Sequence, residues 1–371
     1  MCQNLEAKAP EIIYINKMPI QLSRRFLIAT GIGGILSLLL FIFWDTLVPL
    51  TIISELPWGT PSQHVDPFST VKSLQHILPD TYNSSLGNVA VVTFLSTRDE
   101  EDSTEEDAFF IATRTMAYKL LYDPVTGTRQ GIPFLVMVTP SVALWKREQL
   151  TKDGAHVFEV DFIPISDAMK QGEKRWIDQY TKLRLWELTA FDRLLYIDSD
   201  MLILKCLDGI FDDPAAHPVN LISVEGLPDD ELDAPEKYLL AGVDDVYGPN
   251  NPIPRPPSDS FNAGFFLLQP STEMFAKYHR VMHYYDRYQK NQMEQGLLNY
   301  VHRLNGNLPW QRLTPGKWSV TWPNINDWNY GVATLHDKFW GPNRDSKLKE
   351  LWEQDRDSMF EYFKPKSNVT E

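Results

Sequence analysis

The sequence predicts an α/β protein with an open, doubly wound sheet, preceded by a membrane anchor. Short apolar runs rich in β-branched residues alternate with segments of helical spacing between residues 89 and 197. Such alternation is typical of a parallel sheet covered by helices on both faces. A single stretch without charges, residues 26–44, precedes these elements, and its length is that of a membrane-spanning helix.

Composition excludes several classes of protein. Of the 371 residues, 43% are apolar and 23% are charged, which argues against a disordered chain. The 35 Lys and Arg against 49 Asp and Glu leave a net charge of -14, which argues against general nucleic-acid binding. Only Cys2 and Cys206 are present, so a disulfide scaffold and a Cys-based zinc site are excluded. An acidic protein also repels phosphorylated ligands unless a cation or a few placed basic groups intervene.

The apolar segment 26–44 would span roughly 29 Å as a helix, close to the thickness of the hydrocarbon core. Basic residues precede it, and no Lys or Arg follows it until Lys72. The positive-inside rule therefore predicts a cytosolic tail, 1–25, with the rest of the chain across the membrane. The competing interpretation is a cleaved signal peptide, whose apolar region is usually shorter and starts earlier. We expect an uncleaved signal anchor.

Residues 45–87 contain five prolines and many Ser and Thr, which is typical of a stem. The rest of the chain, 88–371, is then the lumenal domain. Its sequon at Asn368, and the one at Asn83 in the stem, are glycosylation acceptors if this topology holds.

Continuous apolar runs predict buried strands, and helical spacing predicts the helices between them. The strands are expected at 89–95, 133–138, 157–160 and 194–197, and the helices at 108–122, 144–152 and 174–188. Ligands of such sheets bind at the carboxyl ends of the strands. The residues that follow Ile197 are therefore the first candidates for a functional site.

Two carboxylates, Asp198 and Asp200, follow this strand directly. Oxygen ligands are those that hard divalent cations prefer, and such a cation can bridge a diphosphate. The simpler interpretation is an ordinary turn, in which this pattern is common. The apolar segment 201–204 comes next, so the carboxylates interrupt a buried path where unpaired charge is costly. A cation site at this strand end is the interpretation that we favour.

Other segments place polar or small residues beside apolar ones. Asn262 can donate and accept hydrogen bonds at the start of an apolar strand, and Gly264 lets a ligand approach the backbone. Glu294 and Gln295 open an apolar helix, and His336 ends an apolar run where it can complete a metal site with the two aspartates. A tight turn, a helix N-terminus and a structural histidine are the corresponding simpler interpretations.

Together these motifs resemble glycosyltransferase family 8, and more narrowly glycogenin and its Golgi relatives. The resemblance is carried by TKLRLWELT (181–189), DSDMLI (198–203), FNAGFFLLQPS (261–271) and EQGLLN (294–299). In character it is nearest to fungal Golgi N-acetylglucosaminyltransferases and plant glycogenin-like glucuronosyltransferases. It spans about residues 88–340 and implies a GT-A (Rossmann-like) nucleotide-sugar-binding fold with a Mn²⁺-dependent, retaining transfer from a UDP-sugar.

The resemblance also implies roles for single residues. The metal ligands would be Asp198, Asp200 and His336. The catalytic positions at the donor sugar would be Asp259, Glu294 and Gln295. The residues that bind the donor would be Lys182, Asp198, Ser199, Asp200, Asn262, Ala263, Gly264 and Lys338.

Two departures from the family pattern bear on these roles. Glu294 stands where the family usually has Asp, and Lys338 follows His336 more closely than the corresponding lysine in glycogenin. Glycogenin is also soluble and glucosylates itself, whereas an anchored lumenal enzyme suits a glycan acceptor. We therefore expect a single-pass type II Golgi enzyme, with GlcNAc as the first choice of sugar, and we expect no nucleic-acid partner; a homodimer is left open.

A transfer that retains the configuration of the sugar can follow two routes. One is a double displacement through a protein nucleophile, and the other takes place on a single face of the donor sugar. We favour the same-face route because Gln295 is a poor nucleophile. A catalytically silent member of this fold, binding a glycan or a partner, is the alternative function. A metal-dependent hydrolase is a third hypothesis, which would need more ligands than the eight His of the chain offer at strand ends.

Overall fold

The computed structural model describes residues 86–97, 106–170, 174–342 and 344–365, which belong to one compact unit. The predicted tail, anchor and nearly all of the stem lie outside the described residues, as do Asn83 and Asn368. Within the described part of the chain, no helix is long and apolar enough to cross a membrane. The predictions for residues 1–85 therefore stay predictions.

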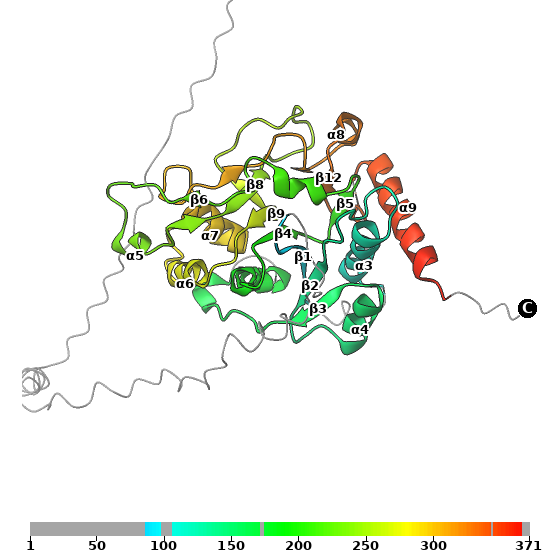
Figure 1. The fold of residues 1–371 in the computed structure, drawn as a ribbon, viewed down its shortest axis with the longest axis horizontal. Coiled ribbons are helices and arrows are strands. Elements are labelled where there is room, and N and C mark those ends of the chain that lie inside the picture. The colour runs from blue at the N-terminus through cyan, green and yellow to red at the C-terminus, as the bar shows by residue number, and fades with distance from the viewer. Residues whose placement is uncertain (1–85, 98–105, 171–173, 343, 366–371) are drawn as a thin grey trace, which may run out of the picture. The chain divides into compact units, whose positions relative to one another are not determined.

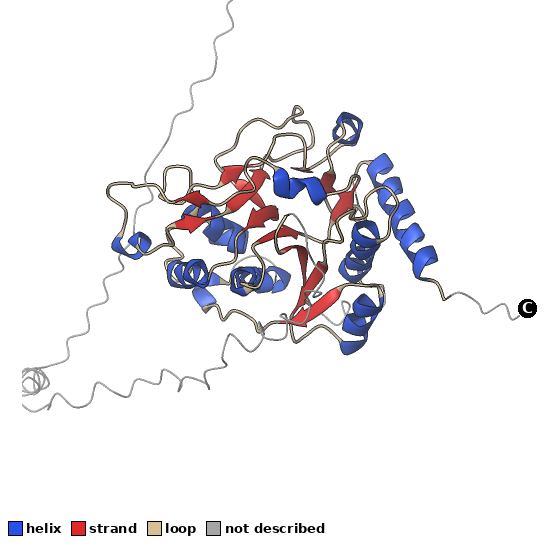
Figure 2. Ribbon diagram, viewed as in Figure 1, coloured by secondary structure: helices blue, strands red, loops and turns tan. Residues whose placement is uncertain are grey.

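Strands lie at the centre of the described part, with helices on both sides of them (Figures 1 and 2). The strands are β1 (Val89–Leu95), β2 (Phe134–Val138), β3 (His156–Glu159), β4 (Arg193–Ile197), β5 (Met201–Ile203), β6 (Val219–Asn220), β7 (Lys237–Tyr238), β8 (Leu240–Asp244), β9 (Phe261–Leu268), β10 (Gln311–Arg312), β11 (Ser319–Thr321) and β12 (Thr334–His336). The α-helices are α3 (Ala108–Leu121), α4 (Leu144–Lys152), α5 (Asp229–Leu232), α6 (Thr272–Val281), α7 (Met293–Val301), α8 (Ile325–Tyr330) and α9 (Ser346–Phe363). The 3₁₀ helices are η3 (Asp167–Met169), η4 (Lys174–Glu187), η5 (Asp208–Asp212) and η6 (Lys290–Gln292).

The main sheet has seven strands in the order β10-β8-β9-β4-β1-β2-β3. The four strands predicted from apolar runs, β1 to β4, pair in parallel. The parallel pairing predicted for these four strands is confirmed, and the complete sheet is mixed because β9 runs antiparallel to both β4 and β8. The predicted helix at 174–188 is present as η4, with 3₁₀ hydrogen bonding.

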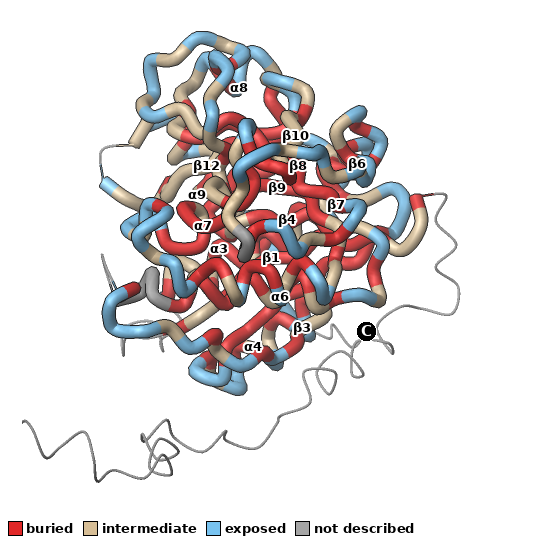
Figure 3. The backbone as a smooth tube through the Cα atoms, turned by 90° about the vertical axis from the view of Figure 1, so that its left-hand side faces the viewer, coloured by how far each residue is buried: buried red, intermediate tan, exposed pale blue. Residues whose placement is uncertain are grey.

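The side chains of β1 alternate between two separate cores, which explains why the strand has no polar face. Ala90, Val92 and Phe94 pack in one hydrophobic cluster with η4, α6 and α7. Val89, Val91 and Leu95 pack in another with α3. Figure 3 shows buried residues concentrated along β1, β4 and β9. The sheet is thus covered on both faces, and its strand ends are left for ligands.

A second, three-stranded sheet, β11-β12-β5, stands beside the carboxyl end of β4. Residues 198–200 connect β4 of the main sheet to β5 of the small one. β12 pairs antiparallel with β5, with His336 opposite Met201. The small sheet therefore brings a residue from late in the chain to the turn that follows β4.

His302, which follows α7, is 1% exposed and lies within a network of neutral hydrogen bonds. Its Nδ1 lies 2.7 Å from the Leu308 carbonyl oxygen, and its Nε2 lies 2.6 Å from the Tyr278 hydroxyl. Because a carbonyl oxygen only accepts, Nδ1 carries the proton and Nε2 accepts from Tyr278. Burial lowers the pKa of His302 to about 3.

This histidine makes the stability of the fold depend on pH. Below the ordinary pKa of 6.5 the unfolded chain takes up a proton that the folded chain refuses until about pH 3, so stability falls as the pH falls through this window. The loss is at most about 1.4 kcal/mol per pH unit. We expect His302→Gln to lose less stability than the wild type between pH 7 and pH 5. Urea unfolding at both pH values measures this, and equal losses in the two proteins would contradict it.

Candidate active site

The turn after β4 is held by backbone hydrogen bonds at both of its acidic residues. The Asp198 N–H donates to the Gly264 carbonyl oxygen of β9 at 2.8 Å. The Asp200 carbonyl oxygen accepts from the Asp337 N–H, just after β12, at 3.1 Å. The main sheet thus fixes the first carboxylate and the small sheet fixes the second, so their separation is set by how the two sheets meet.

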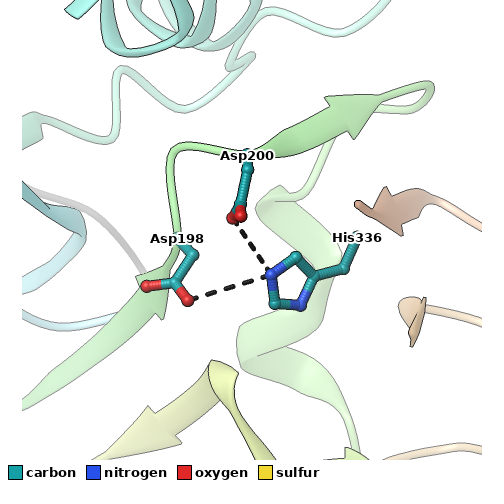
Figure 4. Close-up of side chains that lie close together, drawn as sticks. All are labelled: Asp198, Asp200 and His336. Atoms are coloured by element: carbon teal, nitrogen blue, oxygen red, sulfur yellow. Dashed lines mark hydrogen bonds and ion pairs between the residues drawn. The ribbon is translucent and has the colours of Figure 1, made fainter. Parts of the chain in front are cut away.

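Three side chains that sequence reasoning assigned to a metal do lie together (Figure 4). The His336 Nε2 lies 3.0 Å from an oxygen of Asp200 and 3.8 Å from an oxygen of Asp198. One ligand atom from each residue lies within 4.8 Å of the other two. Two carboxylates and an imidazole suit a divalent ion such as Mn²⁺, so these residues could hold such an ion.

Gly264 makes room for this cluster. A Cβ placed on Gly264 would lie 2.3 Å from the His336 Cε1 and 2.8 Å from an oxygen of Asp198. Real side chains do not approach so closely, and the histidine ring is held by hydrogen bonds at both of its nitrogens. The glycine of the FNAG motif is therefore needed because the imidazole and the carboxylate occupy the space beside the strand.

The cluster concentrates charge in a buried place. Burial alone would raise the pKa of Asp200. The nearby His336 and Lys338 lower it by more than burial raises it, so the pKa of Asp200 lies well below the ordinary value. Burial lowers the pKa of His336, and Asp200 and then Asp198 more than reverse this, so the net pKa is raised. A proton on His336 thus offsets carboxylate charge, and a bound cation would replace that proton at the same nitrogen.

Lys182 is buried between two carboxylates. Its Nζ lies 2.9 Å from Asp198 Oδ1 and 2.9 Å from Glu294 Oε1. Burial lowers the pKa of Lys182, but the two carboxylates raise it above its ordinary value. The Tyr196 hydroxyl donates to the same Asp198 oxygen at 2.5 Å. The extra methylene of Glu294 is therefore used in an ion pair with the lysine.

A group of amides contacts β9 close to the ion pair of Lys182, since Gln295 follows Glu294 directly on α7. The Gln295 Oε1 accepts from the Ala263 N–H at 2.9 Å, and the Gln295 Nε2 donates to Asp245 at 3.0 Å. The Asn262 amide also donates to Asp245, at 3.3 Å. The Asn262 Oδ1 lies 3.1 Å from the His336 Nδ1. These contacts join the amide group to the metal cluster in one hydrogen-bonded network.

The structure brings most of the predicted site residues together. Ser199 is buried within the turn, and the Lys338 Nζ lies 3.0 Å from Asp200 at the edge of the cluster. Asp259 is exposed, and among the described contacts its side chain makes no hydrogen bond or ion pair. Sequence reasoning missed Asp245 and Tyr196. Acidic residues at the end of an apolar strand, here at 244–245 as they are after β4, were the available signal for Asp245.

Comparison with known proteins identifies the family. The family model described as "Glycosyl transferase family 8" matches residues 136–335, more than half of the chain. Two uncharacterized proteins of Schizosaccharomyces pombe are 34% and 33% identical over 64% and 70% of this chain, and over 71% and 75% of their own lengths. The chain therefore belongs to glycosyltransferase family 8, and it is a glycosyltransferase with a mixed α/β, GT-A-like fold.

More distant matches are shorter. Galactinol synthase 1 of Solanum lycopersicum is 28% identical over 41% of this chain and 48% of its own. Among solved structures, the bifunctional glycosyltransferase WbbM is 14% identical with a TM-score of 0.46, over 76% of this chain and 52% of that one. This chain thus matches about half the length of each of these two proteins.

Gly264→Ala tests whether the cluster binds a cation. The added methyl group would push the His336 ring and the Asp198 carboxylate apart, and we expect Mn²⁺ affinity to fall by about ten-fold or more. Calorimetric titration of the purified full chain with Mn²⁺ measures this. Gly209→Ala is the matched control, because its Cβ would meet only Trp318, at an ordinary 3.6 Å. Equal Mn²⁺ affinity in the two variants would contradict the assignment.

Proposed function

We propose that this family 8 glycosyltransferase is a type II Golgi enzyme that transfers GlcNAc from UDP-GlcNAc to a glycan, with retention of configuration and with Mn²⁺. The observation that carries the proposal is the convergence of Asp198, Asp200 and His336 at the carboxyl end of β4. The apolar segment 26–44 and the basic residues before it support the membrane topology.

The metal would be held by the three residues of the cluster. When bound there, it would neutralise negative charge on the leaving diphosphate, where electrostatic help to the transition state is greatest. Lys338 pairs with Asp200 at the edge of the cluster, and its side chain is 36% exposed. It is therefore placed to meet an anionic ligand, whereas Lys182 is enclosed and holds Asp198 in position.

The amide group suits the sugar side of the donor. Asn262 and Gln295 present donors and acceptors whose orientations are fixed by hydrogen bonds to Asp245 and to the backbone of β9. Both oxygens of Asp245 already accept from these amides, so Asp245 positions them rather than standing free as a nucleophile. This supports the same-face route, in which the donor diphosphate helps to deprotonate the acceptor.

A catalytically silent protein of the same family is the second candidate. The observation in its favour is that the Lys182 ammonium is already shared by two carboxylates, one of them the departure Glu294. Such a protein would bind a glycan or a partner but would release no UDP. The same assay therefore separates the two candidates.

Asp200→Asn tests the proposed function. The substitution removes one of the carboxylate ligands, so we expect UDP release to fall by about a hundred-fold or more while the thermal unfolding midpoint changes little. The assay measures UDP released by the full chain with Mn²⁺ from UDP-GlcNAc, UDP-glucose, UDP-glucuronic acid and UDP-galactose. The last donor is included because galactinol synthases are among the relatives.

Asp286→Asn, at an exposed position, is the matched control. It should retain the wild-type rate of UDP release. Wild-type turnover by Asp200→Asn in metal-depleted buffer would refute the role of this carboxylate. UDP release by the wild type from UDP-glucose alone would correct the choice of GlcNAc and leave the enzyme class intact.

A further inference from the structure

Two aromatic side chains meet on the surface beside the candidate active site. The rings of Tyr247 and Trp322 lie 4.7 Å apart between centroids, at an interplanar angle of 60°. Tyr247 is 81% exposed, the highest value among the exposed large hydrophobic side chains of the described residues, and Trp322 is half-buried. A single exposed ring is common on protein surfaces, so the position of this pair beside the site is what gives it interest.

The connectivity places this pair next to the functional residues. Trp322 follows β11, whose last residue, Thr321, pairs in parallel with His336. Neighbouring strands lie about 4.8 Å apart, so Thr321 lies beside His336. Trp322 is the next residue along the chain. Tyr247 comes two residues after Asp245, which holds the amides of Asn262 and Gln295. In the chain, one ring of the pair is therefore close to the Asp198–Asp200–His336 cluster and the other is close to the amides of Asn262 and Gln295.

The backbone of Trp322 is held in an unusual conformation. Its φ of 51° lies in the left-handed region, and Met293 is the only other non-glycine residue with a positive φ among the described residues. A bulky residue in this region is strained, and such strain persists where surrounding contacts over-determine it. Strain of this kind is often found at ligand sites.

Those surrounding contacts come from Arg255, which is 6% exposed. Its guanidinium donates to the carbonyl oxygens of Thr321 and Trp322, each at 3.4 Å. It also forms an ion pair with the buried Asp327 at 2.8 Å. The Asn324 side chain donates to the Pro249 carbonyl oxygen, which ties the Trp322 segment to the Tyr247 loop. These contacts hold the backbone that carries Trp322 and link it to the loop that carries Tyr247.

We propose that the exposed face of Tyr247, with the Trp322 ring set edge-on beside it, forms a stacking platform for a pyranose ring of the acceptor glycan. One face of a pyranose ring carries C–H bonds, whose positive ends match the negative face of an aromatic ring. A platform at the joint between the cluster and the amide group would hold the acceptor against the donor sugar. The proposal rests on the proposed function, because it assigns the acceptor side of the same site.

Tyr247→Ala and Trp322→Asn test the platform in the full chain. Asn tolerates the left-handed conformation of residue 322, so that variant removes the ring and keeps the backbone. With the best donor and with N,N′-diacetylchitobiose, cellobiose or lactose as acceptor probe, we expect the acceptor KM to rise about ten-fold in each variant. UDP release from the donor without acceptor, and the donor KM, should stay within about two-fold of the wild type.

Two control variants separate ring stacking from a general effect. Tyr247→Phe keeps the ring and should keep the acceptor KM. Tyr362→Ala removes a 51% exposed ring from α9 and should also keep it. A ten-fold rise in acceptor KM in Tyr362→Ala, or an unchanged value in both Tyr247→Ala and Trp322→Asn, would overturn the platform.

A binding measurement keeps this test separate from that of the proposed function. Saturation-transfer NMR, with irradiation of the aromatic protons, should show transfer to at least one of the three disaccharides in the wild type and a loss of transfer in Tyr247→Ala. Absence of UDP release from every donor would refute the proposed function, and the NMR result would then decide the platform alone. If saturation transfer reaches none of the three disaccharides in the wild type, the platform is overturned.

An aromatic pair can also face a membrane surface. Binding of wild type and Tyr247→Ala to phosphatidylcholine vesicles tests this. Weaker vesicle binding by the variant with an unchanged acceptor KM would assign the pair to a membrane and overturn the platform.

Discussion

The structure around the candidate active site depends on balancing buried negative charge at the end of β4. Asp198, Asp200 and Glu294 lie within one hydrogen-bonded cluster with Lys182, Lys338 and His336. Carboxylates removed from water are costly unless cations accompany them. The lysines supply part of this compensation, and His336 supplies the rest with either a proton or a bound cation. The charge balance therefore leaves one position, the His336 Nε2, where a bound cation could replace a proton.

The architecture makes this balance by joining distant parts of the chain. β4 delivers Asp198, the turn delivers Asp200, and β12 delivers His336 through its pairing with β5. β9 runs antiparallel beside β4, so that Gly264 leaves the space which the cluster occupies. Because the metal cluster and the amide group share β9 as a common wall, a shift of that strand would disturb both. This dependence gives the short FNAG segment a larger structural role than its length suggests.

Lys182 and Lys338 carry the same ammonium group, but their surroundings give them different roles. Lys182 is enclosed by two carboxylates and has little surface left for a ligand. Lys338 forms an ion pair with Asp200 and keeps about a third of its side chain exposed. Glu294, which departs from the family pattern, forms an ion pair with Lys182. The aromatic platform, fixed from below by Arg255, would complete the site on its acceptor side.

The sequence by itself determined the local features whose cause lies within a few residues. Continuous apolar runs predicted β1 to β4 almost to the residue, and polar residues after apolar runs predicted Asp198, Asp200 and His336 as candidate site residues. Only the tertiary structure decided the antiparallel insertion of β9, the pairing of Glu294 with Lys182 and the inclusion of Asp245. Each of these is a contact between segments far apart in the chain, and it is set by how sheets and helices pack. Periodicity reports which faces are buried, but it does not report which partner buries them.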